Sequence, residues 1–194
     1  MSKADPSASK KERNKTIRWV VTIFLVTILV SGAFSLISDE LMSNSSIAVA
    51  FLILLVIVLI GIIFDVIGVA VTAADEKPFH SMAARKVSGG LEAIRLLRNA
   101  ERVSSICNDV VGDICGVVSG SASATIAAQV LQKFEFSWPA LISLLMSAMV
   151  AGLTVGGKAI GKTFAINSST QIVSLVGKVI YMLRHIPELF VKKK

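Results

Sequence analysis

The feature that most constrains this chain is the segment of residues 47–74, which is almost wholly apolar and in which Asp65 is the only charged side chain. Roughly 18 apolar residues in a row suffice for a helix to cross a bilayer. A second run occupies residues 17–38 and is longer than the apolar region of a cleavable signal peptide. Hydrophobic residues make up 54% of the 194 residues, above the usual share in a soluble domain. The sequence therefore predicts an integral membrane protein with one compact membrane domain.

The remaining segments complete an all-α fold. Residues 75–102 carry Pro78 near a helix start and a break at "SGG", which predicts a cytoplasmic hairpin of two short amphipathic helices on the membrane surface. Residues 156–171 form a polar, glycine-rich passage. Residues 171–190 have one apolar side, which predicts an amphipathic juxtamembrane helix at the interface. We expect four transmembrane helices, at residues 17–38, 47–74, 103–130 and 138–156.

The basic residues predict an orientation. Of the 20 Lys and Arg, 6 lie in residues 1–18, 6 in 75–102 and 7 in 157–194, whereas the other two connections hold none and one, Lys133. Positive side chains mark cytoplasmic connections. We therefore expect a multi-pass protein of the cell (plasma) membrane with both termini in the cytoplasm, and residues 1–16 as a disordered basic tail. The net charge of +7 then indicates connections that face anionic lipid and not a nucleic-acid partner.

The third predicted helix carries two stripes of residues. Small residues at every fourth position favour close approach of a partner helix, in the same chain or in a dimer: Gly112, Gly116, Gly120, Ala124 and Ala128. The second stripe is polar, and Asp109 and Asp113 share its face because they are four positions apart: Ser105, Asp109, Asp113, Ser121 and Thr125. Cys107 and Cys115 are too far apart along a helix for a disulfide and are interpreted as packing residues.

The acids within these helices predict a site. An ionised carboxylate costs about 2.5–3.5 kcal/mol at the centre of a bilayer, so it persists where it faces a partner, water or an ion. Asp65 and Asp113 lie at similar depth from the same side and are expected to converge. Oxygen-rich clusters suit a hard cation such as Mg²⁺. The candidate metal ligands are Asp65, Ser105, Asn108, Asp109, Asp113 and Ser121. Two alternatives stay open: the acids are hydrated near the interface, or they are protonated or paired with a lysine.

Other chemistry is poorly supported by the sequence. His80 and His185 stand alone, without the spacing of metal ligands. The stretch "GGKAIGKT" has the wrong glycine spacing for a phosphate loop and follows a membrane helix. No Ser–His–Asp or Cys–His arrangement is visible, so we expect no enzyme.

From about residue 47 to residue 183, the order of segments resembles the membrane domain of the CNNM/CorC family of magnesium transporters. That domain has three membrane helices, a cytoplasmic hairpin between the first two and a belt-like juxtamembrane helix after the third. Here these would be residues 47–74, 103–130 and 138–156, the hairpin 75–102 and the belt 171–190. The helix at 17–38 is an addition to this pattern, and no CBS pair is expected in this chain.

The family motifs are kept in outline. "FDVIGVA" at 64–70 has Asp65 where the family usually has serine and Gly68 where it has glutamate. "CNDVVG" at 107–112 keeps Asn108 and Val111 of the pattern G-N-N-x-V-N and has Asp109 for the second asparagine. "GKAIGKTFA" at 157–165 keeps Gly157, Lys162 and Ala165, with Lys158 in place of the acid and Gly161 in place of the proline of G-E-x-x-P-K-x-x-A.

The resemblance implies a largely dehydrated Mg²⁺ among serine, asparagine and acidic groups, export coupled to Na⁺, and a homodimer. The leading hypothesis is therefore an ion-transport protein for Mg²⁺ or another cation. The second is a non-transporting scaffold or accessory subunit that binds other membrane proteins, in which Lys158 neutralises the acids. A Lys158 side chain directed at the acids favours the second hypothesis, and one directed at the cytoplasm leaves the site available.

Overall fold

The computed structural model describes residues 6–43, 45–134 and 138–191, with side chains from residue 16 to residue 185 outside the same gaps. Four of its helical stretches are long and apolar enough to cross a membrane: Thr16–Ser43, Ile47–Ala73, Ala100–Lys133 and Pro139–Asn167. This confirms the four apolar helices predicted from the sequence and is what a multi-pass membrane protein requires. The side of the membrane on which the termini lie stays a prediction.

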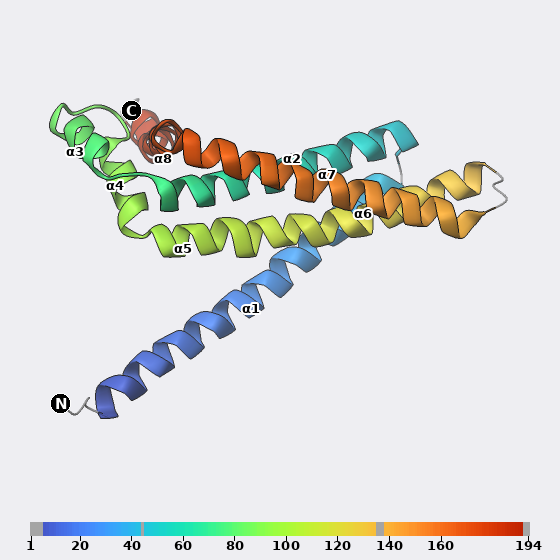
Figure 1. Ribbon diagram of the computed structural model, residues 1–194, viewed down its shortest axis with the longest axis horizontal. Helices are drawn as coiled ribbons and strands as arrows, with labels where there is room; N and C mark the ends of the chain where they lie inside the picture. The colour runs from blue at the N-terminus through green and yellow to red at the C-terminus, as the bar shows by residue number, and fades with distance from the viewer. Residues whose placement is uncertain (1–5, 44, 135–137, 192–194) are drawn as a thin grey trace.

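Three of these spans lie side by side (Figure 1). They are α2 (Ile47–Ala73), α7 (Pro139–Asn167) and a continuous span made of α5 (Ala100–Ser105), η1 (Ile106–Gly112) and α6 (Asp113–Lys133). Buried apolar side chains of α2 and α6 fill the space between them, among them Leu54, Val58, Ala122 and Ile126. Their outward faces remain apolar, as expected for helices whose surroundings are lipid.

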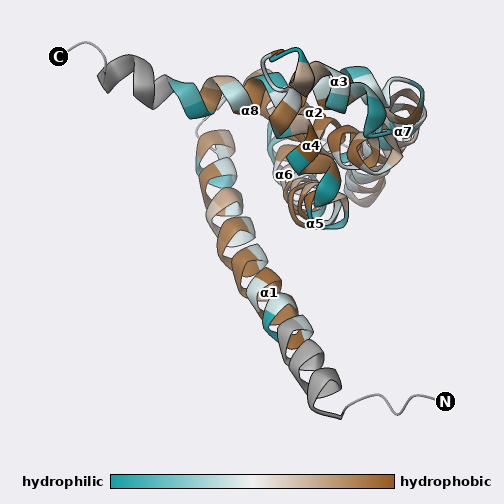
Figure 2. Cartoon of the chain, turned by 90° about the vertical axis from the view of Figure 1, so that its left-hand side faces the viewer, coloured by the Kyte–Doolittle hydropathy of each residue, from teal (hydrophilic) through white to brown (hydrophobic). Residues whose placement is uncertain are grey.

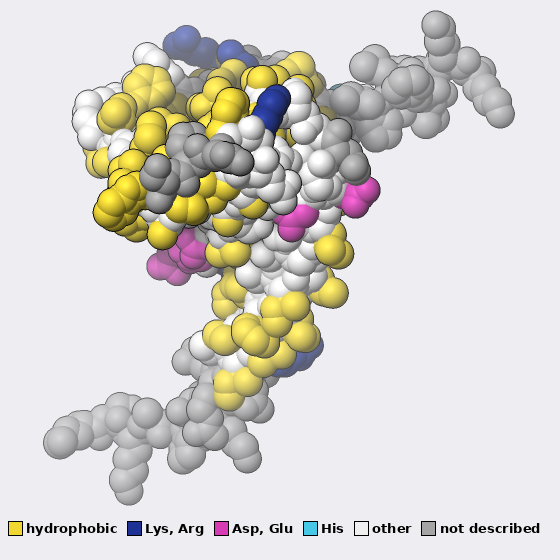
Figure 3. Space-filling model, turned by 90° about the vertical axis from the view of Figure 1, so that its right-hand side faces the viewer, with side chains coloured by type: hydrophobic (Ala, Val, Ile, Leu, Met, Phe, Trp, Pro, Cys, Tyr) yellow, Lys and Arg dark blue, Asp and Glu magenta, His cyan; other side chains and the backbone are white. Residues whose placement is uncertain are grey.

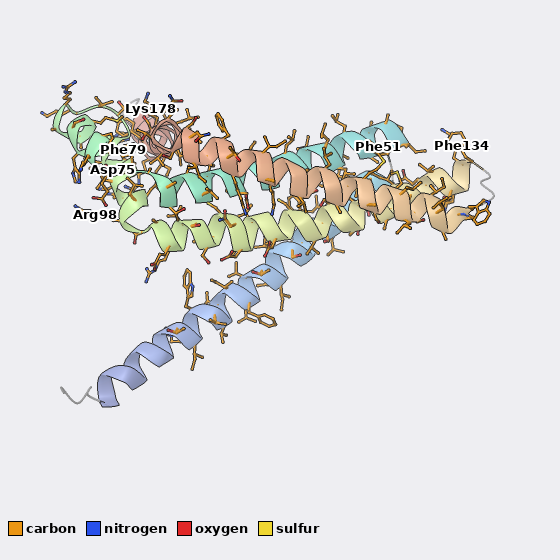
Figure 4. All side chains as sticks on the ribbon, viewed as in Figure 1. Phe51, Asp75, Phe79, Arg98, Phe134 and Lys178 are labelled. Carbon is orange, nitrogen blue, oxygen red and sulfur yellow. The ribbon has the colours of Figure 1, made fainter. Side chains whose placement is uncertain are left out.

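The short helices α3 (Lys77–Ala84) and α4 (Gly90–Arg98) gather with α8 (Ser169–Val191) at one end of this bundle (Figure 1). Figure 2 shows α8 lying across the end of the bundle instead of continuing along it. Phe79 of α3 is fully buried here with Ala93, Leu97 and Val173. Figure 4 shows Phe79 at this end, whereas Phe51 and Phe134 lie at the opposite end. The predicted hairpin and juxtamembrane helix are therefore helical and packed together, and their cytoplasmic position stays a prediction.

The first helix, α1 (Pro6–Ser43), leaves the bundle at an angle (Figure 1). Near its C-terminal end, the Nε2 of Gln129 donates to the carbonyl of Met42 at 2.8 Å, and Met42 is fully buried. Toward the N-terminus its apolar side chains are exposed, including Phe24 and Leu29, and Figure 3 shows them as a hydrophobic arm. Exposed apolar surface on a membrane helix is compatible with lipid contact.

Both ends of α1 differ from the sequence prediction. The predicted disordered tail of residues 1–16 is helical from Pro6 onward, and residues 1–5 lie outside the described residues. The reason is local: proline is favoured in the first turn of a helix, and the following stretch "ASKKERNK" is rich in good helix formers. The helix also continues past the predicted end at residue 38 to Ser43, because Ser38 and Met42 are buried against the bundle.

A further difference concerns residues 157–167, which the sequence assigned to a polar passage and which form the last turns of α7. Glycine in a helix interior costs roughly 1 kcal/mol relative to alanine. Here Gly161 and Ala165 are buried, and a Cβ on Gly161 would lie 2.7 Å from Cγ2 of Val66 on α2. Close packing on α2 therefore offsets the low helix propensity of the glycines.

Candidate functional site

The side chains of Asp65 and Lys158 meet inside the bundle. Asp65 lies in the C-terminal part of α2 and is 4% exposed. The Nζ of Lys158 on α7 is 3.9 Å from Oδ1 of Asp65, and the lysine side chain is 21% exposed. Lys158 therefore points at an acid of the predicted site. Among the described residues, Asp65 is the one predicted ligand with which Lys158 forms an ion pair.

Glycines on α7 make this contact possible. Gly157 and Gly161 flank Lys158 and face Ile62 and Val66, which flank Asp65 on α2. Added Cβ atoms at either glycine would crowd these two side chains, so the glycines favour the close approach of the two helices. The same close approach of α2 and α7 brings the side chains of Lys158 and Asp65 within reach of each other.

A third element completes the surroundings of the lysine. The Nζ of Lys158 also donates to the backbone carbonyl of Gly112 at 3.4 Å. Gly112 ends η1, a π-helical stretch over Ile106–Gly112 within the third span. π-Helical turns inside α-helices are rare and occur frequently at functional sites. The lysine thus joins α2, η1 and α7 at one point of the bundle.

Two buried oxygen atoms near this point have no hydrogen-bond partner among the described residues, Oδ2 of Asp65 and Oδ1 of Asn108. The Nδ2 of Asn108 donates to Oγ of Ser104 at 3.2 Å. The Oδ1 of Asn108 faces Gly68, which is one turn from Asp65 on the same side of α2. A buried oxygen without a partner points to a water molecule or an ion.

The structure gives three other predicted ligands, Ser105, Asp109 and Ser121, hydrogen-bond partners of their own. Asp109 and Ser105 are paired with each other, Ser105 Oγ donating to Asp109 Oδ2 at 2.8 Å. Ser121 donates to Oδ1 of Asp39 on α1 at 3.5 Å, and Asp39 was not among the predicted site residues. No sequence pattern links Asp39 to Ser121, since 82 positions separate them. Among the described residues, no three His, Cys, Asp or Glu side chains form a metal-binding group.

Asp113, the last predicted ligand, is exposed and lines a groove of about 610 Å³ between α6 and α7. Lys158 lines the same groove, together with small side chains of both helices: Gly112, Gly116, Ser119, Gly120, Ser123, Ser147, Ala151 and Thr154. Added Cβ atoms at Gly116 and Gly120 would meet open space. The predicted row of small residues is therefore divided: Gly112 lies against Lys158, and the next two glycines face the groove.

Cys107 and Cys115 are both free and buried, which confirms their interpretation as packing residues. A Cβ on Gly61 would lie 2.9 Å from Cβ of Cys115, so the cysteine fills the contact between α2 and the third span. The backbone carbonyl of Gly112 accepts a hydrogen bond from Lys158, and a sequence pattern could not identify this partner.

Comparison of the chain with models of protein families, with curated proteins and with solved structures gave no match.

Proposed function

We propose that this chain is a membrane protein of CNNM/CorC type that binds a cation, Mg²⁺ in the first instance, at Asp65 and Asn108 and moves it across the membrane. The proposal rests on two buried oxygens on facing elements, Asp65 Oδ2 and Asn108 Oδ1, for which the described residues offer no hydrogen-bond partner. An ionisable residue inside a membrane bundle most often marks a transport or relay function.

The contact between Lys158 and Asp65, taken alone, favours a non-transporting protein, so the transport proposal requires the lysine to move away from the carboxylate. The lysine ammonium is a cation held 3.9 Å from Asp65, a loose distance for an ion pair. A metal ion that binds the carboxylate would displace the ammonium toward the adjoining groove, which Lys158 already lines. Lysine and metal then alternate at Asp65, so that the buried carboxylate always has a positive partner.

Replacing Asp65 with asparagine is expected to reduce Mg²⁺ flux at least tenfold, because the proposed site, as far as the described residues go, has no other charged oxygen ligand. The measurement is Mg²⁺ uptake into proteoliposomes with an internal indicator. Asp75→Asn is the matched control, since Asp75 is exposed and lies beyond the end of α2 (Figure 4). Equal flux in Asp65→Asn and wild type would contradict the assignment of Asp65, and wild-type flux no higher than in empty liposomes would contradict transport.

A second candidate is a non-transporting accessory subunit, favoured by the contact between Lys158 and Asp65 and by the groove between α6 and α7. In this case the lysine neutralises the acid permanently, and Gly116 and Gly120 receive a helix of another membrane protein or of a second copy.

Gly120→Leu tests the second candidate, because leucine would fill the groove without touching the Asp65–Lys158 contact. If the groove binds a second copy of the chain, energy transfer between labelled copies in liposomes should fall several-fold in Gly120→Leu. Gly32→Leu on α1 is the control, since Gly32 also faces open space but outside the groove. Unchanged energy transfer in Gly120→Leu would exclude the groove as a dimer contact.

A further inference from the structure

A second polar pocket lies between α1 and α5, away from Asp65. It has a volume of about 620 Å³ and is lined by Thr16, Arg18, Trp19, Thr22, Glu101, Arg102 and Ser105. The guanidinium of Arg102 lies 5.7 Å from the centre of the Trp19 ring. Neither Arg18 nor Arg102 forms an ion pair with a carboxylate among the side chains described. We propose that this pocket binds the headgroup of an anionic phospholipid.

The depth of the pocket supports a lipid headgroup. In the sequence the apolar run of α1 begins at Ile17, two residues after Lys15, and the third span begins at Ala100. The lining residues therefore lie in the first two turns of both spans, at the boundary between water and hydrocarbon. Tryptophan and arginine are typical side chains of this boundary. Figure 1 shows α1 diverging from α5 toward this end, so the pocket is open to a lipid that approaches between the helices.

The charges of the pocket favour an anionic lipid over a zwitterionic one. Two arginines and Glu101 leave one positive charge in the lining, which one phosphodiester charge would balance. Asp109 lies just beyond the lining and accepts the hydroxyl of Ser105. The fifteen residues before Thr16 add five Lys and Arg against two acids, a composition that attracts anionic membrane surfaces. Guanidinium groups bind phosphate oxygens through two parallel hydrogen bonds.

Trp19 reports on this site directly, because the chain has two tryptophans and the other, Trp138, directly precedes α7 and is four residues from Phe134, which Figure 4 shows at the opposite end of the bundle. The Trp138→Phe protein is reconstituted in liposomes in which either phosphatidylglycerol or phosphatidylcholine carries brominated chains that quench tryptophan. We expect Trp19 to be quenched with about fivefold preference for phosphatidylglycerol, the factor that one basic residue contributes at a membrane surface. The reciprocal Trp19→Phe protein, with Trp138 as the probe, should show no preference.

Arg18→Gln and Arg102→Gln are each made in the Trp138→Phe background. Each should bring the ratio of Trp19 quenching by phosphatidylglycerol to quenching by phosphatidylcholine close to one. Arg98→Gln is the control, since Arg98 is exposed on α4 and is not part of the lining (Figure 4). Circular dichroism checks that each variant keeps its helices. Equal quenching by both lipids in the unsubstituted pocket, or a preference that survives both arginine replacements, would overturn the proposal. So would loss of the preference when inorganic phosphate replaces chloride at constant ionic strength, because the site would then bind phosphate and not the lipid.

Discussion

Replacing Lys158 with methionine is expected to lower the free energy of unfolding by about 2–4 kcal/mol, one of the two largest effects that we predict for a single substitution in this chain. Methionine keeps much of the length of lysine but leaves Asp65 as a buried carboxylate without a positive partner. Asp65 is 4% exposed and its Oδ2 already lacks a hydrogen bond among the described residues. The measurement is helix loss by circular dichroism during titration of detergent-solubilised protein with a denaturant.

The double variant Asp65→Asn/Lys158→Met separates the missing charge from the missing packing. Removing both charges eliminates the uncompensated carboxylate, so the double variant should recover most of the lost stability. Lys162→Met is the matched control on the same helix, because Lys162 is exposed and should change stability by less than about 0.5 kcal/mol. A Lys158→Met protein as stable as Lys162→Met would show that the contact between Lys158 and Asp65 does not form in the membrane protein.

The same variant also bears on the proposed exchange between lysine and metal. Without the competing ammonium, Mg²⁺ should stabilise Lys158→Met more than wild type, because a ligand that binds only the folded state raises its stability by an amount that grows with the logarithm of its affinity. Equal stabilisation of both proteins by Mg²⁺ would argue against exchange at Asp65 while leaving the structural pair intact.

Replacing Gly177 with alanine is the second substitution with a large expected effect. A Cβ at Gly177 of α8 would lie 2.6 Å from the carbonyl oxygen of Gly89, which is backbone and cannot rotate away. Gly89 itself has φ +86°, a left-handed conformation that side chains other than glycine rarely adopt. Overpacking costs about 1–3 kcal/mol where side chains can shift, and this contact with the backbone should reach or exceed the upper end of that range.

The consequence should be local, at the end of the bundle where α8 crosses α4. Hydrogen exchange should increase in α3, α4 and α8, with little change in the centre of α2. Gly116→Ala is the control, since its Cβ would meet open space and alanine favours a helix. Gly177→Ala with exchange rates like those of wild type would mean that α8 does not pack on α4 as described.

The sequence by itself determined the membrane class and the number of spans. Apolar runs of this length have few alternatives to crossing a bilayer as helices, because every backbone group must be hydrogen-bonded inside the lipid. The amphipathic segments 75–102 and 171–190 were likewise readable, since helical periodicity is local. The bounds of the helices were harder to predict from the sequence. Residues 157–167 have the composition of a connection and are helical only because Gly161 and Ala165 pack against other elements.

The composition of the site was decided by tertiary structure. Six oxygen-bearing residues looked equivalent in sequence, but only Asp65 and Asn108 carry a buried oxygen without a hydrogen-bond partner among the described residues, and Lys158 lies between α2 and η1. Asp109 and Asp113 are exposed, although both were predicted as metal ligands. The physical reason is that burial depends on how closely helices approach. That approach is set by glycines such as Gly68 and Gly157, whose effect appears only when the facing helix is in place.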